Sequence, residues 1–284
     1  MANKRWLRIV LVLTLLLAAV FLVSCGKAET EGKTSGIVIV IPEDPPSFNA
    51  MIADTGYDAL VMELVMLGLT DLDTNGDVIT ELAESLPTLD NGDVVMDEEA
   101  WTMDVTWRLR QGVVWQDGEA VTADDVIFTY EAIANPETGG WIPGLDYIDS
   151  VEKIDDYTLV VHYNSVYPGY LLQFGGEQVV IWPAHYCDAE QGFIAWDCAR
   201  QPLSNGPYTL EEWVVGDHLT FAKNPDYYQE GKPTIEQITV RIIPDDTVRK
   251  TIILCRSVVP PDLPDDIRRR LYKTLELASN LAEQ

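Results

Sequence analysis

The chain has 284 residues, of which 47% are hydrophobic and 23% charged, as is typical of a folded globular protein. Its length suffices for one large domain or two ordinary ones. The formal net charge of −27 gives a surface that repels nucleic-acid phosphates, so the sequence predicts no nucleic-acid partner.

The N-terminus has the layout of an export signal. Three basic residues precede an apolar run at residues 9–23, which is shorter than the roughly 20 residues that a membrane-spanning helix needs. The run ends in small residues before Cys25, a pattern that resembles the bacterial lipoprotein processing box. We therefore expect a signal peptide at residues 1–24. Residues 25–35 should then consist of the lipidated Cys25 and a flexible tether. A plain signal peptide is the alternative.

Three further cysteines follow. Export would place them where disulfides persist. Cys187 and Cys198 close a short loop, and we predict that they form a disulfide, with two buried free thiols as the alternative. Cys255 is then the cysteine for which we predict no disulfide partner.

The first predicted strand covers residues 37–41, a continuous β-branched run of the kind found in strands buried on both faces. An irregular loop with three prolines follows. Apolar side chains at helical spacing then predict an amphipathic helix at residues 57–67. Thr55 and Asp58 have the spacing of a capping box for its start, and Gly68 suits its end.

The next segment partly matches a calcium-binding loop. Asp71, Asp73, Asn75 and Gly76 occupy its first, third, fifth and sixth places. The twelfth place should hold a bidentate Glu, and here it holds Leu82. We therefore interpret the segment as an Asn-Gly hairpin turn rather than a metal site.

Alternating apolar and polar residues predict a half-buried strand at residues 105–110. After a tight turn at Asp117-Gly118, Thr122 and Asp125 have capping-box spacing for a helix that Asn135-Pro136 ends. Further strands are expected at residues 157–163, from Tyr208 onward, and at residues 235–243. This mixture of elements indicates an α/β fold.

Four carboxylates lie close together: Asp117, Glu119, Asp124 and Asp125. Such a group raises the question of acid–base catalysis, but the predicted turn and helix start give them structural roles. The chain also lacks a phosphate-binding loop and a Gly-x-Ser-x-Gly elbow, and its three histidines are scattered. We therefore predict no catalytic residue, no metal and no cofactor. A surface hydrolase that uses two carboxylates is the alternative.

Several stretches together resemble one family: "WRLRQGVVWQDGEAVTADDV", "SNGPYTLEEWVVGD", "NPDYY" and "IPDD". They are similar to the family 5 extracellular solute-binding proteins, the peptide, dipeptide and nickel receptors of ATP-binding-cassette importers. The resemblance runs from about Ile37 to Leu254. It implies a type II periplasmic-binding-protein fold, in which two lobes close on a solute by hinge motion.

The resemblance also implies a function. We expect a monomeric receptor outside the cytoplasm that binds peptides, contacts the permease subunits of an importer and is held on the membrane by its lipid. Nickel, haem or oligosaccharide are the alternative solutes.

By the same resemblance, residues 36–68 and 164–246 form the first lobe, and residues 69–163 form an extra subdomain. Residues 247–284 diverge from the family, so the second lobe is expected to be missing. The sequence thus predicts a truncated or rearranged receptor that binds solute weakly or not at all by itself. A non-functional fragment is the alternative.

In peptide receptors of this type, the loop between the first strand and the first helix faces the cleft. Asp54, Thr55 and Gly56 match that place. We expect Asp54 to attract an ammonium group of the solute and the helix start to offer N–H groups. The alternative is that Asp54 and Thr55 only cap the helix. Core packing, with a place in the cleft as the alternative, is expected for three aromatic residues: Trp182, Tyr208 and Trp213.

Overall fold

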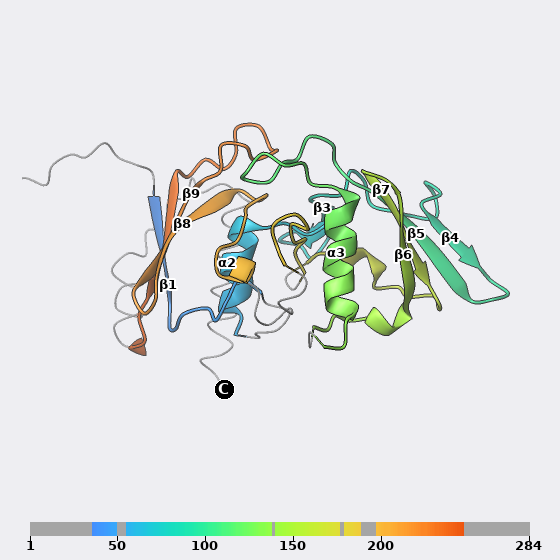
Figure 1. Ribbon diagram of the computed structural model, residues 1–284, viewed down its shortest axis with the longest axis horizontal. Helices are drawn as coiled ribbons and strands as arrows, with labels where there is room; N and C mark the ends of the chain where they lie inside the picture. The colour runs from blue at the N-terminus through green and yellow to red at the C-terminus, as the bar shows by residue number, and fades with distance from the viewer. Residues whose placement is uncertain (1–35, 50–54, 138–139, 177–178, 189–196, 247–284) are drawn as a thin grey trace, which may run out of the picture. The chain divides into compact units, whose positions relative to one another are not determined.

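The computed structural model describes residues 36–49, 55–137, 140–176, 179–188 and 197–246 (Figure 1). The predicted signal peptide, Cys25, the tether, Asp54 and the divergent tail lie outside these ranges. Within them, none of the helices has both the length and the apolar character needed to span a membrane. The α-helices are α2 (Tyr57–Val65) and α3 (Ala123–Ala134). The strands are β1 (Gly36–Ile41), β2 (Thr70–Leu72), β3 (Val78–Thr80), β4 (Val94–Asp97), β5 (Thr102–Arg108), β6 (Ile148–Asp155), β7 (Thr158–Tyr163), β8 (Tyr208–Val214), β9 (His218–Lys223) and β10 (Gln237–Ile242).

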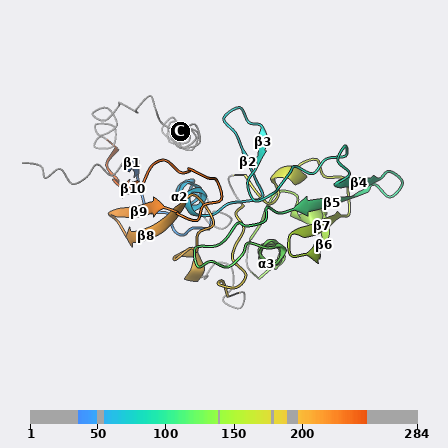
Figure 2. The ribbon, with the colours of Figure 1, turned by 90° about the horizontal axis from the view of Figure 1, so that it is seen from above.

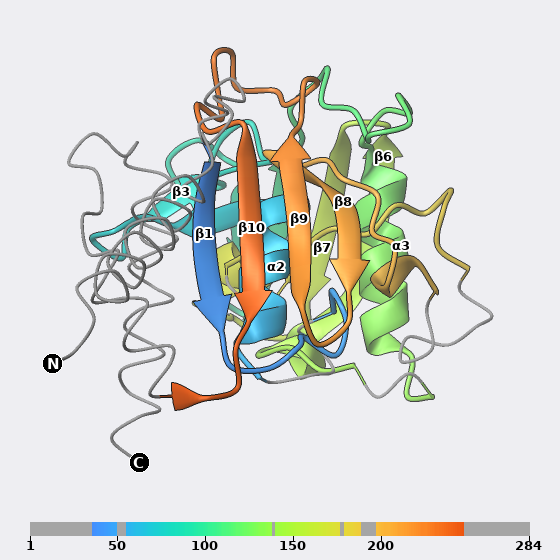
Figure 3. The same cartoon turned by 90° about the vertical axis from the view of Figure 1, so that its left-hand side faces the viewer.

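One sheet has the strand order β1-β10-β9-β8, with α2 behind it (Figure 3). β1 pairs with β10 in parallel, and β9 and β8 continue the sheet antiparallel. Alternate side chains of these strands, such as Ile41, Phe221 and Val240, are buried. The core of this part therefore joins segments that lie about 200 positions apart in the chain.

β1 lies at an edge of its sheet, and only one of its faces is well buried. Ile39 and Ile41 are buried, whereas Val38 is 43% exposed. The prediction of a strand buried on both faces is therefore wrong. A β-branched run favours an extended backbone on either kind of strand, so composition alone does not distinguish them.

Helix α2 buries the predicted apolar stripe but ends at Val65, two residues early. The chain leaves the helix there because another segment binds its backbone: Gly206 N–H donates to the carbonyl of Val65, and Leu67 N–H donates to the Asn205 side chain. Gly68 does not cap the helix. A Cβ at this position would lie 2.6 Å from the Cα of Gly175, so a close backbone approach requires the glycine.

The second sheet has the order β4-β5-β7-β6 and is antiparallel throughout. Helix α3 contacts β6 and covers one face of the sheet (Figure 1, Figure 2). The predicted alternation is confirmed, because Val105, Trp107 and Leu109 are buried while Arg108 is exposed. The capping box of Thr122 and Asp125 and the helix end at Asn135 are confirmed as well.

β2 and β3 form the hairpin predicted at the Asn-Gly turn. Gly76 has φ +86°, and the Asp73 carboxylate accepts the N–H groups of Asn75 and Asp77. The Asp73 carboxylate, which a calcium-binding loop would use as a metal ligand, thus accepts the N–H groups of its own turn.

Candidate functional site

The candidate site lies at the carboxyl edge of the parallel pair β1 and β10. Loops that leave the carboxyl ends of parallel strands form the binding crevices of α/β folds. Here residues 42–56, called the β1–α2 loop below, leave the end of β1 and lead to the start of α2 (Figure 1). Residues 50–54 of this loop are outside the described ranges.

Thr55 and Gly56 lie together at the start of α2. Gly56 is the N-cap and has φ +72°, and the Thr55 hydroxyl donates to the side-chain carboxylate of Asp58. The predicted capping box with Thr55 as N-cap is therefore wrong. A left-handed residue precedes the helix, and only glycine adopts that conformation without strain. A Cβ on Gly56 would meet no atom of the described residues within 4 Å, so these residues leave the space beside the helix start open.

Asp44 holds the first part of the β1–α2 loop, and sequence reasoning missed it. Its Oδ1 accepts the indole N–H of Trp213 at 3.1 Å, and its Oδ2 accepts the N–H of Gly216 at 2.7 Å. Both partners come from the β8–β9 hairpin, about 170 positions away. A lone Asp in a proline-rich loop carries no local signal of such a contact.

Aromatic side chains pack behind this loop. Phe48 is fully buried, and its ring meets that of Trp213 edge-on, with 5.7 Å between the centroids. Trp182 and Tyr208 are buried as expected, and Trp213 is partly buried against the core. Together with Asp44, these contacts fix the described part of the loop to the sheet.

Cys187 and Cys198 form a disulfide, with their Cα atoms 5.5 Å apart. Both cysteines are buried. The Asp197–Ala199 turn that contains Cys198 touches the β1–α2 loop, because Phe48 N–H donates to the carbonyl of Ala199 at 2.8 Å.

The carboxylates at residues 117–125 do not converge on a reactive centre. Asp125 is buried and accepts the N–H groups of Thr122 and Ala184. Burial raises the pKa of Asp125, although these N–H donors favour its ionised form. Asp124 forms an ion pair with Lys153. These contacts are structural.

Asp117 has a partner of its own. Its Oδ2 lies 2.9 Å from Nε2 of His185, and its Oδ1 accepts the N–H of Glu119. Desolvation opposes the ionised form of Asp117, but the hydrogen bonds from His185 and Glu119 outweigh it and lower the pKa of this carboxyl.

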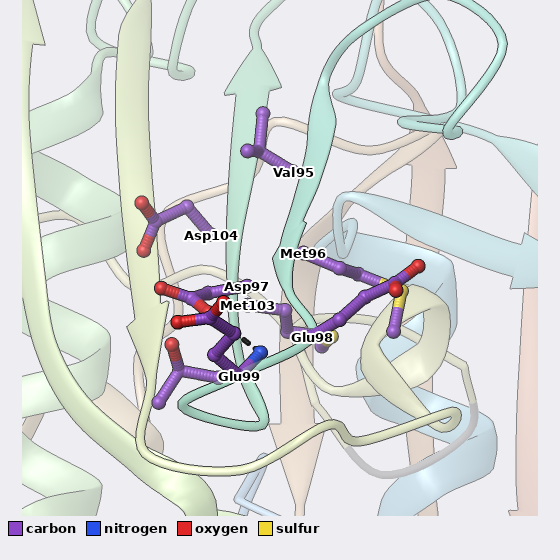
Figure 4. A pocket seen from close by; sticks show the side chains of 8 residues that line it. Val95, Met96, Asp97, Glu98, Glu99, Met103 and Asp104 are labelled. Carbon is purple, nitrogen blue, oxygen red and sulfur yellow. Dashed lines mark hydrogen bonds between the residues drawn. The ribbon is translucent and has the colours of Figure 1, made fainter.

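A shallow depression of about 520 Å³ lies at the tip of the β4–β5 hairpin (Figure 4). Its lining includes Asp97, Glu98, Glu99 and Asp104. Glu98 points to the opposite side of the hairpin from the other three carboxylates, and Asp97 accepts backbone N–H groups of its own turn. Across the described ranges, no group of His, Cys, Asp or Glu could hold a metal ion.

Comparison with known proteins identifies similar chains. The family model described as bacterial extracellular solute-binding proteins, family 5 Middle, matches residues 77–259. The oligopeptide-binding protein AppA of Bacillus subtilis is 26% identical over 263 residues, which cover 86% of this chain and 45% of AppA. Protein XP55 of Streptomyces lividans is 30% identical over 248 residues, or 84% of this chain and 42% of XP55.

Solved structures share the fold. The oligopeptide-binding protein of Thermus thermophilus, complexed with a pentapeptide, has a TM-score of 0.68 at 16% identity. The match covers 79% of this chain and 44% of the Thermus thermophilus chain. Bacillus subtilis AppA, in complex with a nonapeptide, has a TM-score of 0.64 at 23% identity. The match covers 78% of this chain and 42% of the AppA chain. The chain therefore spans less than half the length of these proteins, and the predicted fold class is confirmed.

Proposed function

The chain belongs to the family 5 bacterial extracellular solute-binding proteins, and from this premise we propose that it is the solute-binding component of an ATP-binding-cassette importer for peptides. Members of the family are binding proteins rather than enzymes, and they act outside the cytoplasm. The described residues have the type II periplasmic-binding-protein fold. The observation that carries the proposal is the family match over residues 77–259.

Peptides are the proposed solute because of the relatives. AppA and several similar proteins are oligopeptide-binding proteins. Other relatives keep the alternatives open: NikZ of Campylobacter jejuni was solved with Ni(L-His), and a haem-binding protein of Haemophilus influenzae is 23% identical over 288 residues. The choice among these solutes therefore requires a binding experiment.

We assign solute contact to Asp54, Thr55 and Gly56. Two observations support this assignment. The β1–α2 loop leaves the carboxyl edge of a parallel strand pair, and the described residues leave the space beside Gly56 open. In this proposal Asp54 attracts the N-terminal ammonium group of a peptide. The N–H groups in the first turn of α2 offer hydrogen bonds to acceptor oxygens of the same peptide.

A division into a first lobe and an extra subdomain is also part of the proposal. Residues 36–68 and 164–246 form the first lobe, and residues 69–163 form the extra subdomain. This division is supported by the two large sheets, since β1, β8, β9 and β10 fall in the first set of residues and β4 to β7 in the second.

Cys25 carries the lipid in this proposal, and the lipid holds a monomeric receptor near the permease subunits. The support is the apolar run and the small residues before Cys25. Growth of a bacterial host with labelled palmitate tests it: the chain should take up label and sediment with membranes, and Cys25→Ala should abolish the labelling. Labelling that survives this substitution would contradict the assignment.

The binding test uses the purified chain and ligand-detected saturation-transfer NMR, which registers dissociation constants up to roughly the millimolar range. Tripeptides to pentapeptides with a free N-terminus should give a signal, and Asp54→Asn should weaken it, whereas Asp73→Asn, at a distant turn, should not. N-acetylated peptides serve as the matched ligand control. Signal from nickel–histidine or haem but from no peptide would replace the proposed solute, and signal from none of them would overturn the proposed function.

A further inference from the structure

We propose that the Cys187–Cys198 disulfide positions the β1–α2 loop, so that its reduction loosens the loop while the sheet behind it stays folded. The relevance of this device to solute binding rests on the proposed function, because that proposal assigns solute contact to the same loop. The positioning itself is an internal property of the chain and needs no ligand.

The first part of the argument is the contact between the disulfide-bonded turn and the loop. Cys198 lies in the turn Asp197–Ala199, and the carbonyl of Ala199 accepts the N–H of Phe48 at 2.8 Å. Phe48, Cys198 and Ala199 are all buried. A buried backbone N–H that lost this acceptor would be left without a hydrogen bond, so the place of the loop depends on the place of the turn.

The other cysteine belongs to a segment that helix α3 holds. Ala184 N–H donates to Asp125 Oδ1 at 2.9 Å, and Trp182 N–H donates to the Thr129 hydroxyl at 2.9 Å. Cys187 N–H donates to the carbonyl of Pro183, which closes a turn in the same segment. The disulfide therefore connects the turn under the β1–α2 loop to a segment fixed on α3.

Other described contacts of this turn lie within it or link it to the segment of Cys187, where the Tyr186 hydroxyl donates to the carbonyl of Gln201 at 3.0 Å. Arg200 N–H and Gln201 N–H donate back to the carbonyl of Asp197, so these bonds shape the turn without attaching it to the sheet. The guanidinium of Arg200 lies over the ring of Trp213 at 5.9 Å, a distance that gives a weak attraction at an exposed site. The disulfide is covalent and its cysteines are buried, so it resists movement of the turn more strongly than these exposed contacts do.

Asp44 holds an earlier point of the same loop through Gly216 and Trp213, which the disulfide does not touch. Reduction should therefore act on Phe48 and leave the Gly216–Asp44 bond in place. This difference within one loop distinguishes positioning from a general loss of stability.

The test is amide hydrogen exchange of the purified chain before and after mild reduction. An aliquot that is denatured and alkylated reports by mass whether Cys187 and Cys198 were reduced. We expect the Phe48 amide to exchange about tenfold faster or more after reduction. The turn that carries its acceptor, the carbonyl of Ala199, is then no longer held by the disulfide, so the hydrogen bond opens more often. The amides of β10 and of Gly216 should keep their rates. The double variant Cys187→Ser with Cys198→Ser should reproduce this pattern, and Cys255→Ser, with the disulfide intact, is the control.

Two results would overturn the inference. An unchanged Phe48 rate in protein that is shown to be reduced would mean that the disulfide does not position the loop. An equal acceleration of Phe48 and the β10 amides would mean that it stabilises the whole lobe instead. If the expected pattern appears and no solute binds, the positioning stands and the proposed function fails, so the two failures are distinguishable.

Discussion

The carboxylate of Asp125 accepts the backbone N–H of Ala184 at 2.9 Å, although 59 positions separate the two residues. The same carboxylate accepts the N–H of Thr122 at 2.8 Å and the indole N–H of Trp115 at 3.3 Å. Its residue is 3% exposed. Asp125 therefore caps α3 and also holds the segment before Cys187 against that helix.

Replacement of Asp125 by Ala should lower the free energy of unfolding by about 3 kcal/mol or more, because three donors lose a buried acceptor. Urea unfolding measures the loss. Asp124→Ala is the matched control. Its side chain is 61% exposed and pairs with Lys153, so the expected change is under about 1 kcal/mol. Similar losses in the two variants would show that Asp125 has no special structural role.

His162 should make stability depend on pH. Its ring nitrogens lie 2.8 Å from Asp104 and 3.3 Å from Glu152. Partial desolvation opposes the imidazolium, but the hydrogen bonds to the two carboxylates outweigh it and raise the pKa of His162 above 6.5. A raised folded-state pKa means that the stabilisation is complete below about pH 6.5 and is lost as the pH rises through the folded-state pKa.

Urea unfolding of the wild type and of His162→Gln, from about pH 5.5 to pH 8.5, measures this dependence. The stability advantage of the wild type should shrink as the pH rises through this window. Asp104→Asn should flatten the dependence, since it removes one of the two carboxylates. An advantage that stays constant over the range would contradict the assignment.

Gly68→Ala should destabilise the protein by about 3 kcal/mol or more. The added Cβ would lie 2.6 to 2.9 Å from backbone atoms of Gly175, Val179 and Phe174, which cannot move independently. Gly112→Ala is the control, because Gly112 has φ +82° and open space around its Cβ position. Backbone strain alone should cost about 1 kcal/mol there. Thermal unfolding that ranks the two variants in the opposite order would refute the packing argument.

Asp44→Asn should lower the free energy of unfolding by about 1 kcal/mol, because an amide has one acceptor oxygen for two N–H donors. The NMR resonance of the Trp213 indole N–H should move at the same time. Glu43→Gln removes the same charge at the adjacent position and should change stability by less than about 0.5 kcal/mol. An unmoved indole resonance in Asp44→Asn would show that the contact is not maintained in solution.

Local features could be predicted from the sequence because each depends on residues a few positions apart. The capping box of Thr122 and Asp125 and the turn at Gly76 are set by side chains that bond to neighbouring backbone groups. The alternation through Trp107 reflects a sheet with one face on the core. The same local patterns, in a fixed order along the chain, indicate the family from the sequence alone.

The tertiary structure decided what depends on distant residues. Thr55 does not cap α2, because Gly56 in a left-handed conformation precedes the helix, and α2 ends at Val65, because the segment at Gly206 binds its backbone. Asp44 could not be identified from its neighbours, since its partners in the β8–β9 hairpin are about 170 positions away. Sequence periodicity reports which face of an element is buried, whereas the partner that buries it is set only when the whole chain packs.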